Sequence, residues 1–164
     1  MNTKLKVSTL ADTFTRQHRE LDERFCRLRE TALSGDWRDC DRDWSPLSKA
    51  LLDHMAFEER LVFPVYGRSG AAALADTLGL CKEHAEIRDL LERIGCEIEL
   101  HHAPPAELET FITSLREHLA REDALLHPWI TTSSMDGFAL RGVRHWIRTR
   151  LVRAFHREER PMMR

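Results

Sequence analysis

The sequence predicts an all-α protein, built as an up-and-down four-helix bundle with an additional C-terminal amphipathic helix. Glycine and proline are scarce, at 7 and 6 of 164 residues, whereas the helix-forming residues leucine, glutamate, arginine and alanine abound. Apolar residues recur at a spacing of about 3.6, and no segment shows the sustained alternation that marks a strand. A chain of this length can bury one core, so we expect one domain.

Four long helices follow one another with short polar connections, which is typical of an up-and-down bundle. The first is expected to end before Gly35, a residue suited to a helix C-terminus. The second is expected to open with Ser45 as N-cap and Pro46 in the first helical position. Gly79 leaves open a break in the third. The predicted helices run from about Leu10 to Leu33, from Pro46 to between Pro64 and Gly67, from within 68–80 to about Leu100, and from after Pro105 to about Trp129.

A fifth amphipathic segment lies near the C-terminus. Residues 137–164 hold eight arginines and two glutamates, so this end carries +6, and the remainder carries −8 because the whole chain carries −2. We expect a bundle over 1–132 and a loop with a basic helix over 133–164, docked on the same domain. The segment could bind a protein partner or a second copy, whereas nucleic acid and membrane are not favoured. Its apolar side comprises Val143, Trp146, Ile147, Leu151 and Phe155.

Two stretches of the chain are repeats of one another, "HMAFEERLVFP" at 54–64 and "HLAREDALLHP" at 118–128. Both begin with histidine, continue with alanine at the third position and glutamate at the fifth, and end in proline. His18 lies 36 residues before the first stretch, and His84 lies 34 residues before the second. The chain is therefore predicted to contain two helical hairpins of one kind, each with a lone histidine and a His-x-x-x-Glu pair.

The helical register places these polar residues on buried faces. Each histidine falls in a stripe of apolar residues at spacings of three and four, and Glu58 and Glu122 lie one turn beyond two of them. Four helices would thus direct a histidine into the core. The accompanying apolar residues are Phe14, Leu21 and Phe25 with His18; Leu47, Leu51, Phe57, Leu61 and Val65 with His54; Leu80, Ile87, Leu91 and Ile94 with His84; and Phe111, Leu115, Leu125 and Trp129 with His118.

Six buried polar groups need partners, because an unpaired buried charge costs several kcal/mol or is neutralised. An isolated His-x-x-x-Glu is typically a surface pair, but its duplication in an apolar register favours a metal cluster. Imidazoles supply nitrogen donors, and carboxylates can bridge two cations. This donor set is too large for one tetrahedral zinc and suits two metals with room for an exogenous ligand. The predicted metal ligands are His18, His54, Glu58, His84, His118 and Glu122.

With these motifs the chain resembles the hemerythrin-like, HHE cation-binding family over residues 10–130. The resemblance implies a four-helix bundle around two non-heme iron ions, Fe2+ or Fe3+, joined by an oxo or hydroxo bridge. It also implies iron ligation by the four histidines and bridging by Glu58 and Glu122. The donor set would equally suit zinc or manganese, so the choice of iron rests on the resemblance.

The chain departs at two points from the oxygen-carrying members of that family. They have a fifth histidine in a His-x-x-x-His pair on the third helix, whereas the positions four residues from His84 are Leu80 and Arg88. They also bridge with an aspartate five residues after the fourth-helix histidine. Here both Glu122 and Asp123 are available, and the symmetry of the repeat favours Glu122.

The missing imidazole would leave one metal more open to water, hydroxide, peroxide or nitric oxide. Arg88 could hold a carboxylate such as Asp22, stabilise a bound anion, or extend outward along the helix. The remaining histidines are expected outside the site, with His101 and His102 in an exposed loop and His127 at the edge of the bundle.

We therefore expect a non-heme di-iron protein that binds O2, NO or peroxide for sensing, storage, or iron and oxidative-stress handling. One alternative is a redox enzyme that turns over peroxide or NO, or donates iron for iron–sulfur cluster repair. The repair-type relatives carry a further cysteine-bearing N-terminal region that this start does not match, so binding is favoured over turnover. The other alternative is an interaction module switched by the metal.

The sequence favours a cytoplasmic location. The first residues lack the apolar region of a signal peptide, and no apolar run approaches the ~20 residues of a membrane span. The four cysteines form no C-x-x-C pair, which excludes a zinc knuckle or thioredoxin-type motif and is consistent with reduced thiols.

Overall fold

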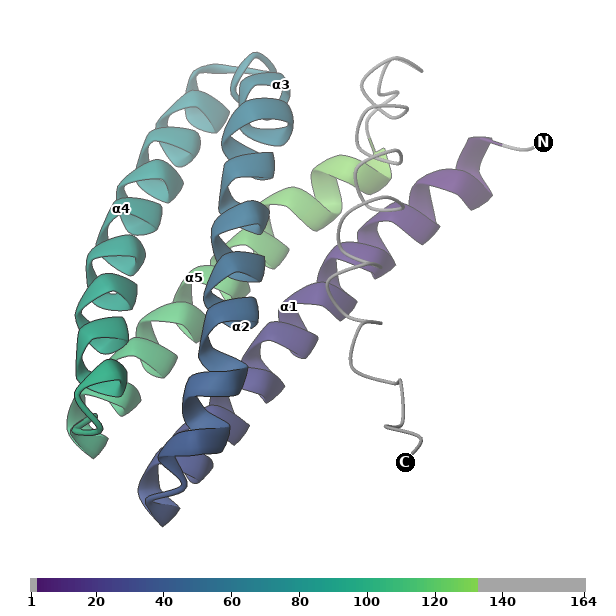
Figure 1. The fold of residues 1–164 in the computed structure, drawn as a ribbon. Helices are drawn as coiled ribbons and strands as arrows, with labels where there is room; N and C mark the ends of the chain where they lie inside the picture. The colour runs from purple at the N-terminus through teal and green to yellow at the C-terminus, as the bar shows by residue number, and fades with distance from the viewer. Residues whose placement is uncertain (1–2, 133–164) are drawn as a thin grey trace.

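The structure is a computed structural model that describes residues 3–132, with the backbone alone for residues 3–10 and 13. The predicted basic helix within 133–164 lies outside the described residues. The elements are the α-helices α1 (Thr3–Ser34), α2 (Trp37–Phe57), α3 (Phe63–Gly67), α4 (Ala71–Glu99) and α5 (Pro105–Thr132), and a π-helical turn, η1 (Glu58–Val62), between α2 and α3 (Figure 1).

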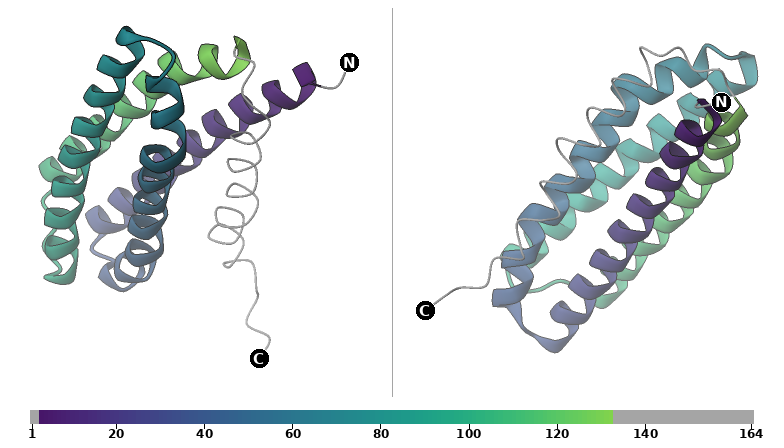
Figure 2. Two further views of the ribbon diagram at one scale, coloured as in Figure 1. Left: turned by 90° about the horizontal axis from the view of Figure 1, so that it is seen from above. Right: turned by 90° about the vertical axis from the view of Figure 1, so that its right-hand side faces the viewer.

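The described helices form the predicted up-and-down four-helix bundle. α2, η1 and α3 follow one another without a gap and make up one rod. The turns from α1 to α2 and from α4 to α5 lie at one end of the bundle, and the connection from α3 to α4 lies at the other (Figure 1). α1 packs against α2 and α5, while α4 packs against α2, α3 and α5 (Figure 2). This rod and the helices α1, α4 and α5 therefore each present one face to a common interior.

Backbone hydrogen bonds around Gly35 close the turn between α1 and α2. Gly35 has a φ of 75°, in the left-handed region that glycine adopts without steric cost. Its amide donates to the Ala32 carbonyl at 3.1 Å, and the Asp36 amide donates to the Thr31 carbonyl at 3.2 Å. These two bonds satisfy the last carbonyls of α1. The predicted end of the first helix at Gly35 is confirmed.

The predicted start of the second helix at Ser45 is wrong. α2 begins nine residues earlier, at Trp37 instead of Pro46, and its N-cap Asp36 accepts a hydrogen bond from the Asp39 amide at 3.2 Å. Pro46 lies inside the helix, with buried residues on either side of it. Burial of these flanking residues offsets the free-energy cost of the hydrogen bond that a proline removes from a helix interior.

Beyond α2 the helix widens into the π-helical turn η1. A π turn holds more residues than an α turn. The residues that face the core beyond it therefore come later in the sequence than an unbroken α-helix would place them. Val62 and Phe63 are buried, whereas Leu61, which the sequence placed in the core, is 41% exposed, and Val65 is only half-buried. The prediction of one unbroken α-helical stripe is therefore wrong beyond Glu58.

α4 and α5 are each uninterrupted. The alternative of a break at Gly79 is not realised, because α4 continues through it. On α5, the predicted core residues Leu125 and Trp129 are half-buried at the edge of an apolar cluster. Leu126 and Ile130 hold the corresponding buried positions. The register prediction is thus off by one residue over the last turns of α5.

Two apolar clusters fill the interior of the described bundle, with a polar layer between them. The first cluster lies toward the α1–α2 and α4–α5 turns, and the second lies toward α3. On α1, His18 stands between Phe14 of the second cluster and Leu21 of the first. His84 on α4 is flanked in the same way. The largest buried side chains of the first cluster include Phe25, Phe111, Met55 and Leu115, and those of the second include Phe63 and Leu80.

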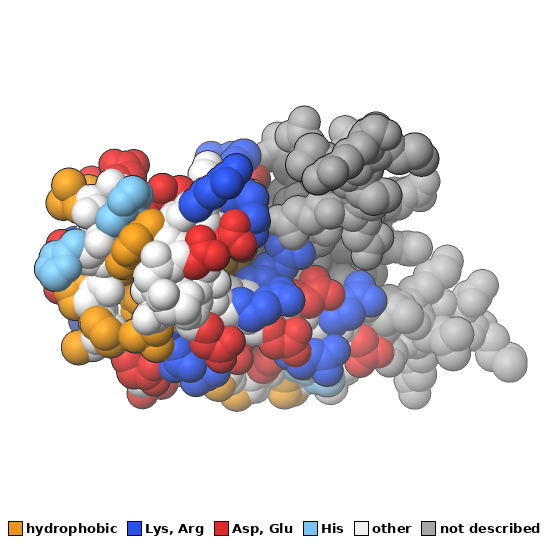
Figure 3. Space-filling view, turned by 60° about the horizontal axis from the view of Figure 1, so that its bottom comes forward, with side chains coloured by type: hydrophobic (Ala, Val, Ile, Leu, Met, Phe, Trp, Pro, Cys, Tyr) orange, Lys and Arg blue, Asp and Glu red, His pale blue; other side chains and the backbone are white. Residues whose placement is uncertain are grey.

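The surface of the bundle carries interspersed acidic and basic side chains (Figure 3). Several form pairs within a helix, such as Lys49 with Asp53 at 3.0 Å and Lys82 with Glu86 at 3.3 Å. Exposed pairs of this kind contribute little stability each, so packing of the apolar clusters holds the fold. None of the helices in the described region combines the length and apolar character needed to cross a bilayer.

Candidate metal centre

Four histidines and two glutamates meet in the polar layer. α1, α2, α4 and α5 each supply one histidine, and the i, i+4 spacing of two His-x-x-x-Glu pairs brings a glutamate to the same face. All six side chains are at most 4% exposed. The structure therefore brings together all the side chains that the sequence placed in the site, namely His18, His54, Glu58, His84, His118 and Glu122.

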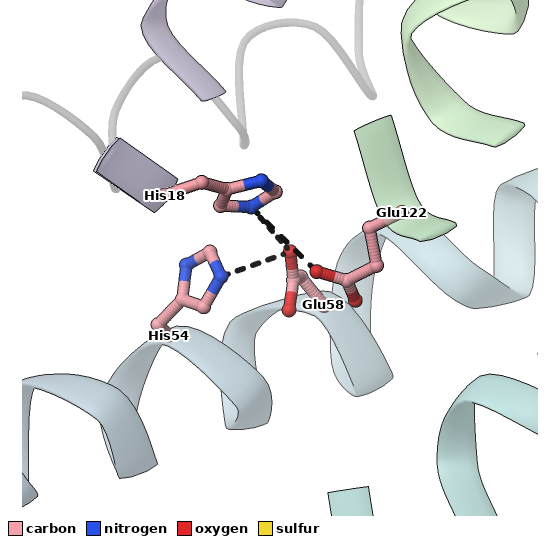
Figure 4. Close-up of side chains that lie close together, drawn as sticks. All are labelled: His18, His54, Glu58 and Glu122. Atoms are coloured by element: carbon pink, nitrogen blue, oxygen red, sulfur yellow. Dashed lines mark ion pairs between the residues drawn. The ribbon is translucent and has the colours of Figure 1, made fainter. Parts of the chain in front are cut away.

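One side of the layer is formed by the two histidines of the first hairpin. Nε2 of His54 lies 3.3 Å from Oε1 of Glu58. Nε2 of His18 lies 3.9 Å from the same oxygen and 3.6 Å from Oε2 of Glu122. Figure 4 shows both rings turned toward the two carboxylates. One carboxylate comes from each hairpin, so the hairpins share this half of the site.

The other side is formed by His84 and His118. Their Nε2 atoms lie 2.9 Å apart, at 3.4 and 3.2 Å from Oε1 of Glu122. Nε2 of His84 is also 3.6 Å from Oε2 of Glu58. Each glutamate therefore approaches histidines on both sides, which is the arrangement expected of carboxylates that bridge two metals.

The nitrogen and oxygen atoms that face the inside of this layer are better arranged to bind a metal than to form hydrogen bonds with one another. Within the described part of the chain, Nε2 of His18, both nitrogens of His54 and all four carboxylate oxygens are buried without a hydrogen-bond partner. Unpaired buried polar atoms are costly, and a cation would satisfy them together. The donor atoms gather into two groups close enough to hold a metal ion each, and Glu122 belongs to both. Imidazole and carboxylate donors suit iron, zinc and manganese.

Asp123, the alternative bridging residue, points away from the inner layer. Its Oδ1 atom lies 3.1 Å from Nδ1 of His18, on the outer side of that ring, and accepts a hydrogen bond from Thr15 at 3.1 Å. Glu122 is fully buried, while the side chain of Asp123 is 32% exposed. The geometry thus places Glu122 between the histidines and Asp123 behind one of them.

Two further carboxylates stand behind the histidines of the second hairpin, and the sequence analysis did not identify them. Oε1 of Glu59 lies 2.9 Å from Nδ1 of His84, and Oε2 of Glu83 lies 3.0 Å from Nδ1 of His118. Such contacts fix the ring orientation and strengthen imidazole as a ligand. The available signal was their position, because each acid directly follows or precedes one of the site residues in the sequence.

Each of these two outer glutamates is held by an arginine. Arg88 donates to Glu59 at 2.8 Å, and Arg121 donates to Glu83. The expectation that Arg88 could hold a carboxylate is met, but the example given, Asp22, is wrong: Asp22 accepts from Arg116 at 2.6 Å instead. Arg88 therefore supports the ring of His84 through Glu59.

Burial and close contact shift the pKa values of the inner residues in opposite directions. Burial lowers the pKa of His18, but contacts with Asp123 and Glu58 outweigh it and raise the pKa to about 10. Burial, reinforced by the nearby His18, lowers the pKa of His54 to about 3. Burial and the charge of Glu122 raise the pKa of Glu58 to about 7. In the metal-free protein, protons thus occupy positions that a bound cation would take over.

Glu122 and His118 shift each other's pKa values in opposite directions. Although burial raises the pKa of Glu122, its contacts with His118 and His84 hold the pKa well below the ordinary range. Burial lowers the pKa of His118, but Glu122 and Glu83 raise it overall. Glu122 is therefore an anion at neutral pH, ready to accept a cation on either side.

A surface groove of about 830 Å³ reaches the site between α4 and α5. His118 forms part of its wall, next to Glu83 and Arg121, and Glu86 and Arg93 lie along its sides. The ion pair of Glu83 and Arg121 lies directly over His118. The groove therefore reaches the outer side of His118, whose side chain is 2% exposed, and the ion pair separates it from the polar layer.

The three described histidines that were expected outside the site do lie outside it. His101 and His102 are exposed in the α4–α5 turn, where the His101 ring stacks on Trp37 with centroids 5.8 Å apart. His127 is half-buried, nine residues beyond His118 on α5. The four cysteines are free, with Cys40 buried and Cys96 exposed.

The fold and the site together define a metal-binding helical bundle. A comparison with protein-family models matches residues 9–130 to the hemerythrin HHE cation binding domain. The chain belongs to this family, as its motifs indicated. In the same comparisons no curated protein and no solved structure matched the chain.

Proposed function

We propose that this chain is a non-heme di-iron protein that binds O2, NO or peroxide in sensing, storage, or the handling of iron and oxidative stress. Bound iron would supply an open coordination position and a change of oxidation state to such a ligand. Free cysteines are usual in reducing compartments, which supports a cytoplasmic role. The proposed ligands are His18, His54, Glu58, His84, His118 and Glu122.

One observation carries this proposal: buried nitrogen and oxygen donors form two groups that share Glu122, and the donors of the His18 and His54 group have no hydrogen-bond partner among the described residues. A shared carboxylate favours two metals over one. Each group offers two imidazoles. The position four residues beyond His84 is Arg88, which forms an ion pair with Glu59. A bound metal would therefore have room for an exogenous ligand, and the groove brings solvent to the outer side of His118.

The chain itself would contribute charge and water exclusion at the site. Glu58 and Glu122 would neutralise part of the charge of two cations, and the apolar clusters on both sides exclude bulk water. In this low-dielectric layer the carboxylates interact strongly with a cation. Binding of a small neutral ligand would thus be favoured over binding of a bulky or strongly hydrated one.

The test is metal analysis of the purified full-length chain together with ultraviolet-visible spectra before and after reduction, and after exposure to O2 and NO. We expect about two irons per chain and a spectrum that bleaches on reduction and returns with the ligand. His118→Ala should lower the iron content. His127→Ala, on the same helix and outside the site, is the matched control and should retain it.

Two results would contradict the proposal. One is a chain that retains only zinc, or no metal, after production with excess iron. The other is an iron-loaded, reduced chain whose spectrum does not respond to O2, NO or peroxide.

A further inference from the structure

The two halves of the site differ in what contacts the outer ring nitrogens. Nδ1 of His84 and Nδ1 of His118 each meet a glutamate, at 2.9 and 3.0 Å. Nδ1 of His18 lies 3.1 Å from Oδ1 of Asp123, an ion-pair contact without hydrogen-bond geometry. Nδ1 of His54 is buried and has no hydrogen-bond partner among the described residues. One half therefore has two carboxylates behind its histidines, and the other half has one.

The internal repeat explains this difference. Glu59 and Asp123 occupy equivalent positions, five residues after His54 and His118, and each contacts the lone histidine of the other hairpin. Glu83 directly precedes His84 and contacts the second histidine of its own hairpin. The residue that directly precedes His18 is glutamine, Gln17. The repeat thus puts a neutral glutamine at the position where the second hairpin has the glutamate that contacts His118.

Gln17 and His54 have complementary unused atoms. Gln17 is 4% exposed, and its Oε1 atom is buried without a hydrogen-bond partner in the described region, like Nδ1 of His54. A histidine that binds metal through Nε2 carries its proton on Nδ1. An amide oxygen can accept a hydrogen bond from that N–H group. No hydrogen bond joins these two described side chains, and an amide at position 17 brings no negative charge to this half of the site.

The surroundings of Gln17 explain why this position carries no charge. Arg121, which holds Glu83, is three residues beyond His118. The equivalent position in the first hairpin, three residues beyond His54, is Phe57, which is 3% exposed in an apolar cluster. A carboxylate at position 17 would lack the arginine that the repeat provides for Glu83, and an unpaired buried charge is costly.

We infer that Gln17 makes the two metal positions unequal, so that the cation at His84 and His118 binds more tightly and the cation at His18 and His54 is the exchangeable one. A carboxylate behind an imidazole raises its basicity and its strength as a ligand, and a neutral amide does so less. This inference rests on the proposed two-metal site. It gives the chain one resident cation and one that it can release.

The test is titration of the metal-free, full-length chain with Co2+, followed by visible absorption and with a competing chelator to resolve two affinities. His54→Ala should remove the weaker step and His118→Ala the tighter one, which assigns each step to its half. Glu83→Gln should weaken the tighter step by about 10–100-fold, the usual effect of losing an outer partner. Gln17→Glu should tighten the weaker step by about 10-fold.

Glu86→Gln is the matched control, because Glu86 lies on the same helix as Glu83, loses the same charge, and pairs with the exposed Lys82 at 3.3 Å. It should leave both steps unchanged. Should Gln17→Glu fail to fold without metal, the Glu83→Gln variant alone decides the matter. Two Co2+ ions bound with equal affinity, or a tighter step unaffected by Glu83→Gln, would overturn this inference while leaving the two-metal site intact. Fewer than two bound cations would overturn the two-metal site and the inference with it.

Discussion

After Glu58 the helix of the first hairpin widens into the π-helical turn η1, whereas α5 of the second hairpin stays α-helical past Glu122. Both nevertheless place a histidine and a glutamate on the buried face, because the Glu58 amide still donates to the His54 carbonyl and η1 begins only at Glu58. The His-x-x-x-Glu spacing therefore determines the inner geometry. The backbone beyond the glutamate can vary without moving the donors.

Outside the donors the two hairpins differ in charge as well as in backbone. The second hairpin places Glu83, held by Arg121, behind His118. The first places neutral Gln17 and apolar Phe57 at the equivalent positions. Each half has two imidazoles, and unequal surroundings of these imidazoles can give two metals different affinities, since outer partners tune the strength of the ligands they contact.

The largest expected effect comes from removing the carboxylate shared by both halves. Glu122→Ala should lower the affinity for both cations by ~100-fold or more, because a bridging ligand contributes more than an outer partner. His54→Ala should affect one cation only. Metal content after equilibrium dialysis distinguishes the two outcomes. Glu117→Ala, an exposed acid on the same helix, is the control. Loss of one cation alone in Glu122→Ala would show that the halves do not share this residue.

The next prediction compares equivalent positions with different burial. Phe63 is 1% exposed, and its ring stacks on that of His84 with centroids 5.2 Å apart. Its counterpart in the repeat is His127, which is half-buried. Phe63→Ala should lower the free energy of unfolding by about 3–5 kcal/mol, and His127→Ala by about 0.5 kcal/mol or less. Chemical denaturation of the metal-free variants measures both. Similar losses would mean that η1 does not shift the register of the first hairpin.

The sequence predicted the four-helix bundle and the six inner residues because both follow from local spacing. His54 and Glu58 share a face in any α-helix, and their repetition at His118 and Glu122 indicates a common site. The start of α2 could not be predicted, since Ser45 and Pro46 are also typical start signals and only tertiary burial extends the helix back to Trp37. The family match over residues 9–130 agrees with the motifs.

The outer partners were beyond reach of the sequence for a different reason. Glu59 contacts a histidine on α4, and Arg88 in turn reaches Glu59, so each contact depends on how two helices are rotated against one another. Many acids lie near a histidine in this chain, and spacing alone does not select among them. The π-helical turn was equally hidden, because Leu61 and Val65 fit an α-helical stripe.

Metal removal should lower stability by an intermediate amount. At a free metal concentration 100 times the dissociation constant, one bound cation contributes about 2.7 kcal/mol, because it binds the folded chain alone. Thermal unfolding with increasing Co2+ should therefore show two successive rises in midpoint, the first from the half with two outer carboxylates. In His54→Ala only the first rise should remain. A midpoint independent of Co2+ would contradict binding in the buried layer.

The smallest expected effect concerns the arginines of the second hairpin. The side chains of Arg88 and Arg121 are 35% and 54% exposed, so each ion pair should contribute about 1 kcal/mol or less to stability. Arg88→Gln and Arg121→Gln should accordingly unfold much like the parent when metal-free.

Their Co2+ affinity should fall by a few-fold, since Glu59 and Glu83 stay in place but are held less firmly. Because the first hairpin has Phe57 at the position equivalent to Arg121, its weaker step should not change in either variant. A loss confined to the tighter step would thus show that the arginines act on the metal through the glutamates rather than on the fold. Equal losses in both steps would show a general effect on the bundle instead.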